Sequence, residues 1–285
     1  MPPELTPGVA DQLGPGVLRL LAPNAGMMTG PGTNTYLIGD REVAVLDPGP
    51  ASSLHIDTIQ QVAPGPIRWI LVTHTHPDHS PAAAKLAAAT GAQLLGQPPP
   101  AGRTQDKTFI PDRVLQDGDV LETDEFRLLA VHTPGHASNH ICYRHAAHRW
   151  LFTGDHIMSG STVVIDPPDG DMGHYLTSLR RLKDLDLAAL APGHGSLIEN
   201  PGEVVDWLIA HRLKREAKVL LRLKAHGGLS VRELTPFVYD EVDEKLYHLA
   251  ERSLLAHLLK LETDGRARII DEQWSLVPEG GESTT

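Results

Sequence analysis

The sequence has little cysteine, few aromatic residues and no long apolar run, and each shortage excludes a class of protein. Cys142 is the single cysteine of the 285 residues, so an internal disulfide is excluded and a reducing compartment is favoured. No uninterrupted apolar stretch approaches the roughly 18 residues of a membrane-spanning helix. Aromatic residues make up 5% of the chain, so aliphatic side chains must supply most of the core.

Positive charge is also scarce. The chain has 25 Lys and Arg against 36 Asp and Glu, a formal net charge of −11. This balance argues against a surface that clamps nucleic acid everywhere, although it leaves room for a local basic groove. The first twenty residues contain two acidic residues, one arginine and no apolar core, so we expect no secretory signal or transit peptide. We therefore predict a cytoplasmic protein that makes no contact with membranes.

The order of the patterns predicts an α/β protein. Strands and helices alternate up to about residue 96, and consecutive strands return between residues 125 and 153. This order predicts two sheets covered by helices. The expected strands are 16–22, 34–39, 42–47, 67–73, 92–96, 125–132, 139–144, 148–153 and 187–191. The expected helices of this part are 52–62, 80–90 and 173–185, and residues 1–14 are expected to be a frayed start.

The pattern changes near residue 200. A long helix is expected at 203–225, with Leu213, Ala217, Leu220 and Leu221 as its apolar stripe. A capping box of Ser230 and Glu233 opens a short helix at 230–238, and a third helix is expected at 244–263. Three helices followed by a hairpin form a winged-helix pattern. The predicted domains are residues 1–202 and 203–285, the second ending in a loose tail from residue 280.

The stretch T-H-T-H-P-D-H at residues 73–79 follows an apolar strand and carries the strongest functional pattern. Side chains alternate in an extended chain, so His74 and His76 point the same way, and Asp78 and His79 lie on the following turn. Histidine and aspartate are ligands of zinc, and also of iron and manganese. A metal site is strongly favoured over a plain polar loop.

Three further motifs end apolar strands beside a glycine. H-T-P-G-H presents His136, F-T-G-D-H presents Asp155 and A-P-G-H-G presents His194. Together with the first motif they supply seven nitrogen or oxygen ligands, which are too many for one tetrahedral ion and fit two ions that share a carboxylate and a water. The predicted cofactors are two divalent ions, zinc in first place, with manganese or iron as alternatives.

This set of motifs resembles the metallo-β-lactamase superfamily over residues 16–200. The resemblance implies an αββα sandwich with the site at one edge. It further implies that His74, His76 and His136 hold one metal, that Asp78, His79 and His194 hold the other, and that Asp155 bridges them. Asp155 resembles the glyoxalase II, lactonase and nuclease branches, since true β-lactamases do not normally carry an aspartate there.

The C-terminal stretch from His211 to Arg266 is similar to the winged-helix domain of the lactamase-β-like protein 2 family. G-P-G-T-N-T-Y-L-I-G and S-T-V-V-x-D-P are similar to its catalytic domain. This resemblance implies a phosphodiesterase that cuts single-stranded RNA with a metal-bridging hydroxide. The alternative is a thioester, lactone or β-lactam hydrolase with a small-molecule substrate. A winged-helix binding protein with a purely structural metal is less favoured, and a homodimer is compatible with the superfamily.

Several residues keep two interpretations. Asp78 is expected to position water or move a proton, and His140 either touches the scissile group or hydrogen-bonds its own loop. Asp47 is expected to orient a metal-bound histidine, with a turn cap as the alternative. The cluster Arg212, Lys214, Arg215 and Lys218 either meets phosphates or is a solvated face, since residues 210–275 are nearly neutral overall.

Overall fold

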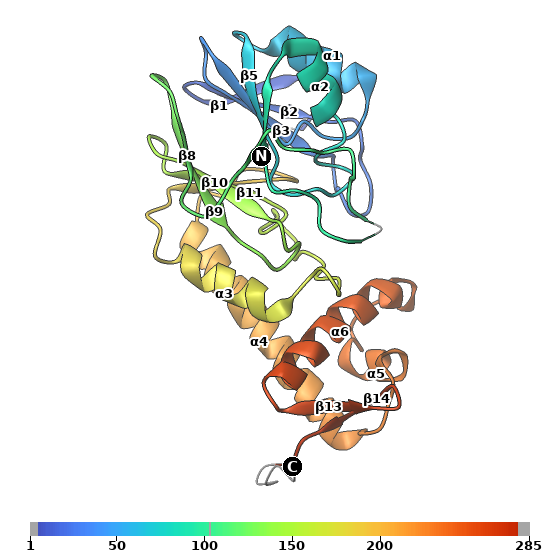
Figure 1. The fold of residues 1–285 in the computed structure, drawn as a ribbon. Coiled ribbons are helices and arrows are strands. Elements are labelled where there is room, and N and C mark those ends of the chain that lie inside the picture. The colour runs from blue at the N-terminus through green and yellow to red at the C-terminus, as the bar shows by residue number, and fades with distance from the viewer. Residues whose placement is uncertain (1–4, 103, 279–285) are drawn as a thin grey trace.

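The computed structural model describes residues 5–102 and 104–278, so the predicted tail at 280–285 lies outside the described residues. Two β-sheets pack face to face, helices cover their outer faces, and a helical unit follows at the C-terminal end (Figure 1). The predicted αββα sandwich with an appended winged helix is therefore confirmed.

The first sheet contains seven strands in sequence order. They are antiparallel at the start of the sheet and parallel from the fourth strand onward. The strands are β1 (Ala10–Gly14), β2 (Val17–Leu21), β3 (Asn34–Ile38), β4 (Val43–Leu46), β5 (Ile67–Leu71), β6 (Gln93–Gly96) and β7 (Arg113–Val114). The parallel crossovers are made by α1 (Ser53–Val62) and α2 (Ala83–Thr90), which lie on one face of this sheet (Figure 1).

The second sheet has the order β12-β11-β10-β9-β8. Its strands are β8 (Val120–Glu122), β9 (Arg127–His132), β10 (Ile141–His145), β11 (Trp150–Gly154) and β12 (Ala189–Pro192). Only β11 and β12 pair in parallel among these strands, because α3 (Met172–Leu182) provides the crossover between them. α3 packs on the outer face of this sheet (Figure 1).

Side chains alternate along the strands, so each sheet packs against one hydrophobic core on its inner face and another on its outer face. On β3, Tyr36 and Ile38 point into the core between the sheets, where they meet Phe152 of the second sheet. Leu37 points the other way and packs with Ile59 of α1. The period-2 pattern thus serves two buried faces at once, which explains why β3 is buried along its whole length.

The first strand was not predicted. Residues 1–14 were expected to be frayed, but Ala10–Gly14 pair with β2 as the edge of the first sheet, so the expectation is wrong for this segment. Asp11 forms an ion pair of 2.6 Å with buried Arg19 of β2. This polar edge strand is held by its neighbour rather than by an apolar pattern of its own.

The C-terminal unit consists of helices followed by a hairpin. Its elements are α4 (Pro201–Ala225), α5 (Val231–Val238), the short 3-10 turn η1 (Glu244–Leu246), α6 (Tyr247–Thr263), β13 (Ala267–Ile270) and β14 (Gln273–Leu276). The capping box of Ser230 and Glu233 is present, as predicted. α4 begins against the second sheet and runs on into the helical unit (Figure 1).

The predicted apolar stripe of α4 is wrong. Leu213 and Leu221 are exposed, whereas the buried residues are Val205, Leu208, Arg212, Glu216, Val219 and Leu223. The buried arginine donates a hydrogen bond to the Val163 carbonyl, and Glu216 pairs with Lys260 at 2.8 Å. A stripe defined by apolar residues alone misses this face, because two of its members are charged residues that are buried against partners.

None of the helices in the described part of the chain combines the length and the apolar character that a membrane crossing requires.

Candidate metal centre

Four loops meet at one edge of the sandwich. They follow β5, β9, β11 and β12, and each begins where an apolar strand ends. Parallel pairing brings the ends of β11 and β12 together, and the backbone N–H of Ile141 donates to the Thr73 carbonyl at 2.7 Å, which joins the two sheets beside the site. The loops bring together all seven predicted ligands in two groups, which are His74, His76 and His136, and then Asp78, His79, Asp155 and His194.

The first group is a trio of histidines. His74 Nε2 and His136 Nε2 lie 2.9 and 3.0 Å from His76 Nδ1, so three ring nitrogens face one another. A proton on His76 Nδ1 could form a hydrogen bond with only one of the other two nitrogens at a time. Three lone pairs directed at one point are the arrangement that a cation requires.

The second group contains two histidines and two carboxylates. His194 Nε2 lies 3.2 Å from Asp78 Oδ2 and 3.2 Å from Asp155 Oδ1, and His79 Nε2 lies 3.4 and 3.3 Å from the same two oxygens. Ligands bonded tetrahedrally at roughly 2.0–2.2 Å stand about 3.3–3.6 Å apart, so the spacing matches a zinc-sized site.

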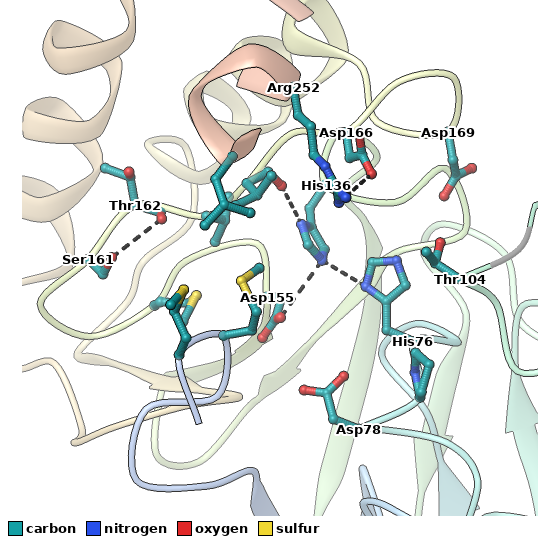
Figure 2. Close-up of a pocket in the computed structure, with 17 residues that line it drawn as sticks. His76, Asp78, Thr104, His136, Asp155, Ser161, Thr162, Asp166, Asp169 and Arg252 are labelled. Atoms are coloured by element: carbon teal, nitrogen blue, oxygen red, sulfur yellow. Dashed lines mark hydrogen bonds and ion pairs between the residues drawn. The ribbon is translucent and has the colours of Figure 1, made fainter. Parts of the chain in front are cut away.

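Asp155 connects the two groups. Its Oδ1 faces His79 and His194, whereas its Oδ2 lies 3.7 Å from His136 Nε2. The two oxygens of one carboxylate thus point into the two groups, which is the geometry of a bridging ligand. Figure 2 shows the contact between Asp155 and His136.

Hydrogen bonds behind the rings fix which nitrogen faces the site. The Nδ1 atoms of His136 and His194 donate to the carbonyls of Val164 and Gly32 at 2.8 and 3.0 Å. Each of these rings therefore carries a proton on Nδ1 and turns its Nε2 towards the centre. Supporting hydrogen bonds of this kind are typical of metal-ligating histidines.

Asp47 fixes the orientation of two more histidines through hydrogen bonds. Its Oδ2 accepts from His79 Nδ1 at 3.0 Å and from the Thr73 hydroxyl at 2.7 Å. That hydroxyl oxygen in turn accepts from His74 Nδ1 at 3.0 Å. Asp47 thus orients His79 directly and His74 through Thr73, which favours the orienting role over the turn cap.

The protonation states also suit cation binding. Burial and the neighbouring His79 and His76 hold the pKa of His74 well below its usual value, so this ring is neutral. Burial lowers the pKa of His194, but Asp155 and Asp78 outweigh it and raise that pKa to about 10. Without a cation, protons on such rings neutralise the carboxylates, and metal binding must release them.

The residues present fit a pair of cations. His79 Nε2, His194 Nε2 and Asp155 Oδ1 are buried and have no hydrogen-bond partner of good geometry. Buried polar atoms are normally satisfied, so a cluster of orphaned atoms that point at one another indicates a missing cation. Gly193 is part of the fit, since a Cβ there would stand 2.7 Å from both Asp155 Oδ1 and His79 Cε1.

His140 does not share the trio's position. It is fully buried, its ring stacks on His74 at 5.1 Å, and its Nδ1 lies 3.0 Å from the Thr133 hydroxyl. This placement behind the ligands favours the loop-bonding alternative. The catalytic role predicted for His140 stays a prediction, as do the individual ligand assignments.

The other histidines near the motifs have packing roles. His132 Nε2 donates to the Ser138 carbonyl at 3.0 Å and supports its loop. His156 is buried with its ring against Tyr175, and Cys142 is a buried thiol whose pKa burial raises to about 12. None of these three groups lies in either ligand cluster.

A cavity of about 430 Å³ opens over the two groups. Figure 2 shows His76, Asp78, His136 and Asp155 in its wall, together with Arg252 beside Asp166. The apolar part of the wall comprises Met27, Met28, Pro77, Met158, Val163, Val164 and Leu249. Leu249 and Arg252 belong to α6, so the C-terminal unit completes the wall of the site.

Sequence reasoning missed this wall. The sequence predicted a helix at 244–263, but neither Leu249 nor Arg252 was singled out for the site. The methionines lie in loops without periodicity, and nothing local connects residue 252 to residue 76. Only the packing of α6 on the sandwich brings these residues to the metal-ligand loops.

A family model described as the metallo-beta-lactamase superfamily matches residues 28–194. The chain belongs to the metallo-β-lactamase superfamily. It is a hydrolase of this superfamily with a histidine and aspartate cluster able to bind two metal ions. A second model, the beta-lactamase associated winged helix domain, matches residues 230–274. The predicted division at 202/203 stays a prediction.

Curated relatives of this superfamily cover nearly the whole chain. A Beta-lactamase-like protein 2 homolog of Caenorhabditis elegans is 32% identical over 90% of this chain and 87% of its own. One of Drosophila melanogaster is 30% identical over 89% and 90%. The Atrochrysone carboxyl ACP thioesterase AgnL7 of Paecilomyces divaricatus is 30% identical over 90% and 82%.

Solved structures of metallo-β-lactamase proteins share the fold. A beta-lactamase domain protein of Burkholderia ambifaria has a TM-score of 0.82 at 20% identity and 96% coverage of both chains. TTHA1623, solved in a di-iron-bound form, has a TM-score of 0.50 at 25% identity over 61% of this chain and 92% of its own. The likeness to the TTHA1623 structure thus covers 61% of this chain, whereas the likeness to the Burkholderia ambifaria protein covers nearly all of it, the C-terminal unit included.

Proposed function

We propose that this protein is a two-metal hydrolase of acyl thioesters and that zinc is its metal. The observation that carries the proposal is the cavity beside the ligand groups, whose wall has an apolar part that includes three methionines, two valines and a leucine. Such a wall receives an acyl chain by removing its apolar surface from water, and it offers little to a polyanionic strand. The similarity to a protein named as an ACP thioesterase supports the same substrate class.

Of the two interpretations of the basic cluster on α4, contact with phosphates is the less favoured. Arg212 is buried, and Arg215 and Lys218 are paired with acidic residues that follow α5. Lys218 Nζ lies 2.8 Å from Glu241 and also contacts Asp240. Because the charges of Arg215 and Lys218 are already neutralised, these two residues contribute little to a basic track of the kind that single-stranded nucleic acids need.

The residues of the site supply orientation and proton transfer. When bound, the metal pair activates a water and polarises the substrate carbonyl. The water oxygen bonds to the carbonyl carbon, and the carbon–sulfur bond breaks. Asp78, partly exposed at the cavity end, is placed to accept the proton of the water and to return it to the departing thiolate. The apolar wall holds the acyl chain and limits access of bulk water.

A direct test compares butanoyl thioesters of N-acetylcysteamine and phosphopantetheine with a labelled single-stranded RNA, using zinc-loaded protein. We expect hydrolysis of the thioesters, its loss in His76→Ala and its retention in His174→Ala, an exposed histidine outside the cavity. Cleavage of RNA without thioester hydrolysis would overturn the proposal.

The second candidate is the phosphodiesterase acting on single-stranded RNA. Its support is the similarity of nearly the whole chain to proteins named Beta-lactamase-like protein 2 homolog, a family whose resemblance implied that activity. The same two-metal centre can act on phosphorus. The assay above decides between the two candidates, because each substrate reports one of them.

A further inference from the structure

The charges around the cavity are unevenly distributed. Asp78, Asp155, Asp166 and Asp169 line it, whereas Arg252 is its only lysine or arginine among the described residues. Two cations at the ligand groups would neutralise Asp78 and Asp155. The remaining charges lie at the part of the wall formed by α6 and the 166–169 loop (Figure 2).

The two aspartates of that loop differ in their contacts. Asp169 accepts hydrogen bonds from the Gln105 side chain at 3.0 Å and from the Ser138 hydroxyl at 2.5 Å. The carboxylate of Asp166 contacts only the Arg252 guanidinium within the described chain, at 3.1 Å. Asp169 is thus held by neighbouring side chains, whereas the carboxylate of Asp166 pairs with Arg252 alone within the described chain.

Arg252 uses little of its binding capacity. A guanidinium carries five N–H donors in a planar fork, and here a single donor atom, NH1, bonds to a carboxylate. Both side chains of this pair are nearly half exposed, so their attraction is weak and easily replaced. A flat anion in the cavity can take the remaining donors in a bidentate contact.

We propose that Arg252 binds an anionic group of the substrate, a carboxylate or a phosphate, at the part of the cavity wall that α6 contributes. Asp166 occupies the guanidinium in the free protein and competes with that group. This inference rests on the proposed function, and it makes the winged-helix unit the part of the protein that selects among thioesters.

The experiment uses a two-by-two set of thioester substrates. Each thioester combines an acyl group, 4-carboxybutanoyl or its uncharged amide 4-carbamoylbutanoyl, with a carrier, phosphopantetheine or the uncharged N-acetylcysteamine. The acyl pair reports a carboxylate contact and the carrier pair reports a phosphate contact. Thioether analogues, in which CH2 replaces the reacting carbonyl, report binding by calorimetry without turnover.

We expect the wild-type protein to prefer one of the charged partners, through KM rather than kcat. Arg252→Gln should abolish the preference, a loss of about 5- to 20-fold in affinity for a charge-assisted contact at a half-exposed site. Arg252→Lys should restore part of it. Asp166→Asn should strengthen it, because the competing carboxylate is gone. Arg232→Gln, an exposed arginine of α5 outside the cavity, should leave it unchanged.

Equal discrimination by the wild type and Arg252→Gln overturns the proposal, since an anion held by the metals alone would behave in this way. A wild type that shows no preference overturns it equally. If no thioester is hydrolysed, the proposed function fails, whereas the thioether affinities still decide whether Arg252 holds an anion.

Discussion

Asp47→Asn should weaken metal binding without disturbing the backbone. Asp47 has φ 49°, a left-handed conformation that asparagine adopts readily, and the substitution preserves the side chain's size. What changes is the oxygen that accepts from His79 and Thr73, which becomes an amide group that donates. His79 loses its orienting partner, and His74 loses the link through Thr73.

The structure sets the size of the effect. Two hydrogen bonds to a charged acceptor, at 3.0 and 2.7 Å, are lost from a buried site. At about 1.5–3 kcal/mol each, they set an upper limit of about 3–6 kcal/mol on the decrease in unfolding free energy of the metal-free protein. Loss of such supporting bonds lowers metal affinity by about 10- to 100-fold, or about 1.4–2.7 kcal/mol.

The assay is a zinc titration against a competing chelator, with metal content measured after equilibration. Asp57→Asn, the same substitution at an exposed position of α1, is the matched control and should bind metal like the wild type. Binding at the group that contains His79 should weaken most, since Asp47 contacts His79 directly. Unchanged affinity at both steps in a folded Asp47→Asn protein would refute the reasoning that Asp47 orients the ligands.

Three further predictions concern stability. His257 is buried, and burial together with nearby Arg212 and Arg215 holds its pKa well below the usual value. The unfolded chain therefore binds a proton that the folded protein does not, and the free energy of unfolding should decrease as the pH drops below about 6.5. His257→Gln should flatten the slope of unfolding free energy against pH there by up to about 1.4 kcal/mol per pH unit. Gly135→Ala should lower unfolding free energy by about 2–4 kcal/mol, because its Cβ would stand 2.4 Å from Tyr175 Cα, whereas unobstructed Gly118→Ala should cost less in the same urea titration. Chelation should lower the melting temperature, by the equivalent of about 2.7 kcal/mol at metal concentrations 100 times the dissociation constant.

The ligand groups were predictable because each ligand sits in a local pattern. A strand, a turn and a histidine or aspartate beside a glycine can be read within a few residues, as at Asp155 and His194. Convergence follows from the fold, since strand ends of packed sheets share an edge. The capping box of Ser230 and Glu233 was predictable for the same reason, because its partners are three residues apart.

The features that could not be predicted from the sequence depend on contacts between residues that are far apart in the chain. β1 is short and polar, and it becomes a strand only because β2 offers a hydrogen-bonding edge and Arg19 meets Asp11. Glu216 is buried because Lys260 and Arg266 lie against it. Periodicity of apolar residues cannot reveal a buried face that contains paired charges.

The metal centre spans long stretches of chain. The trio alone joins His76 to His136, which are 60 residues apart, and His194 joins from beyond both. Ions held there would fasten the two sheets together at one edge, and because the unfolded chain has no such site, they would draw the equilibrium towards the folded state. The protein's resistance to proteolysis should therefore report its metal supply, so that a cell short of metal would lose the polypeptide as well as its activity.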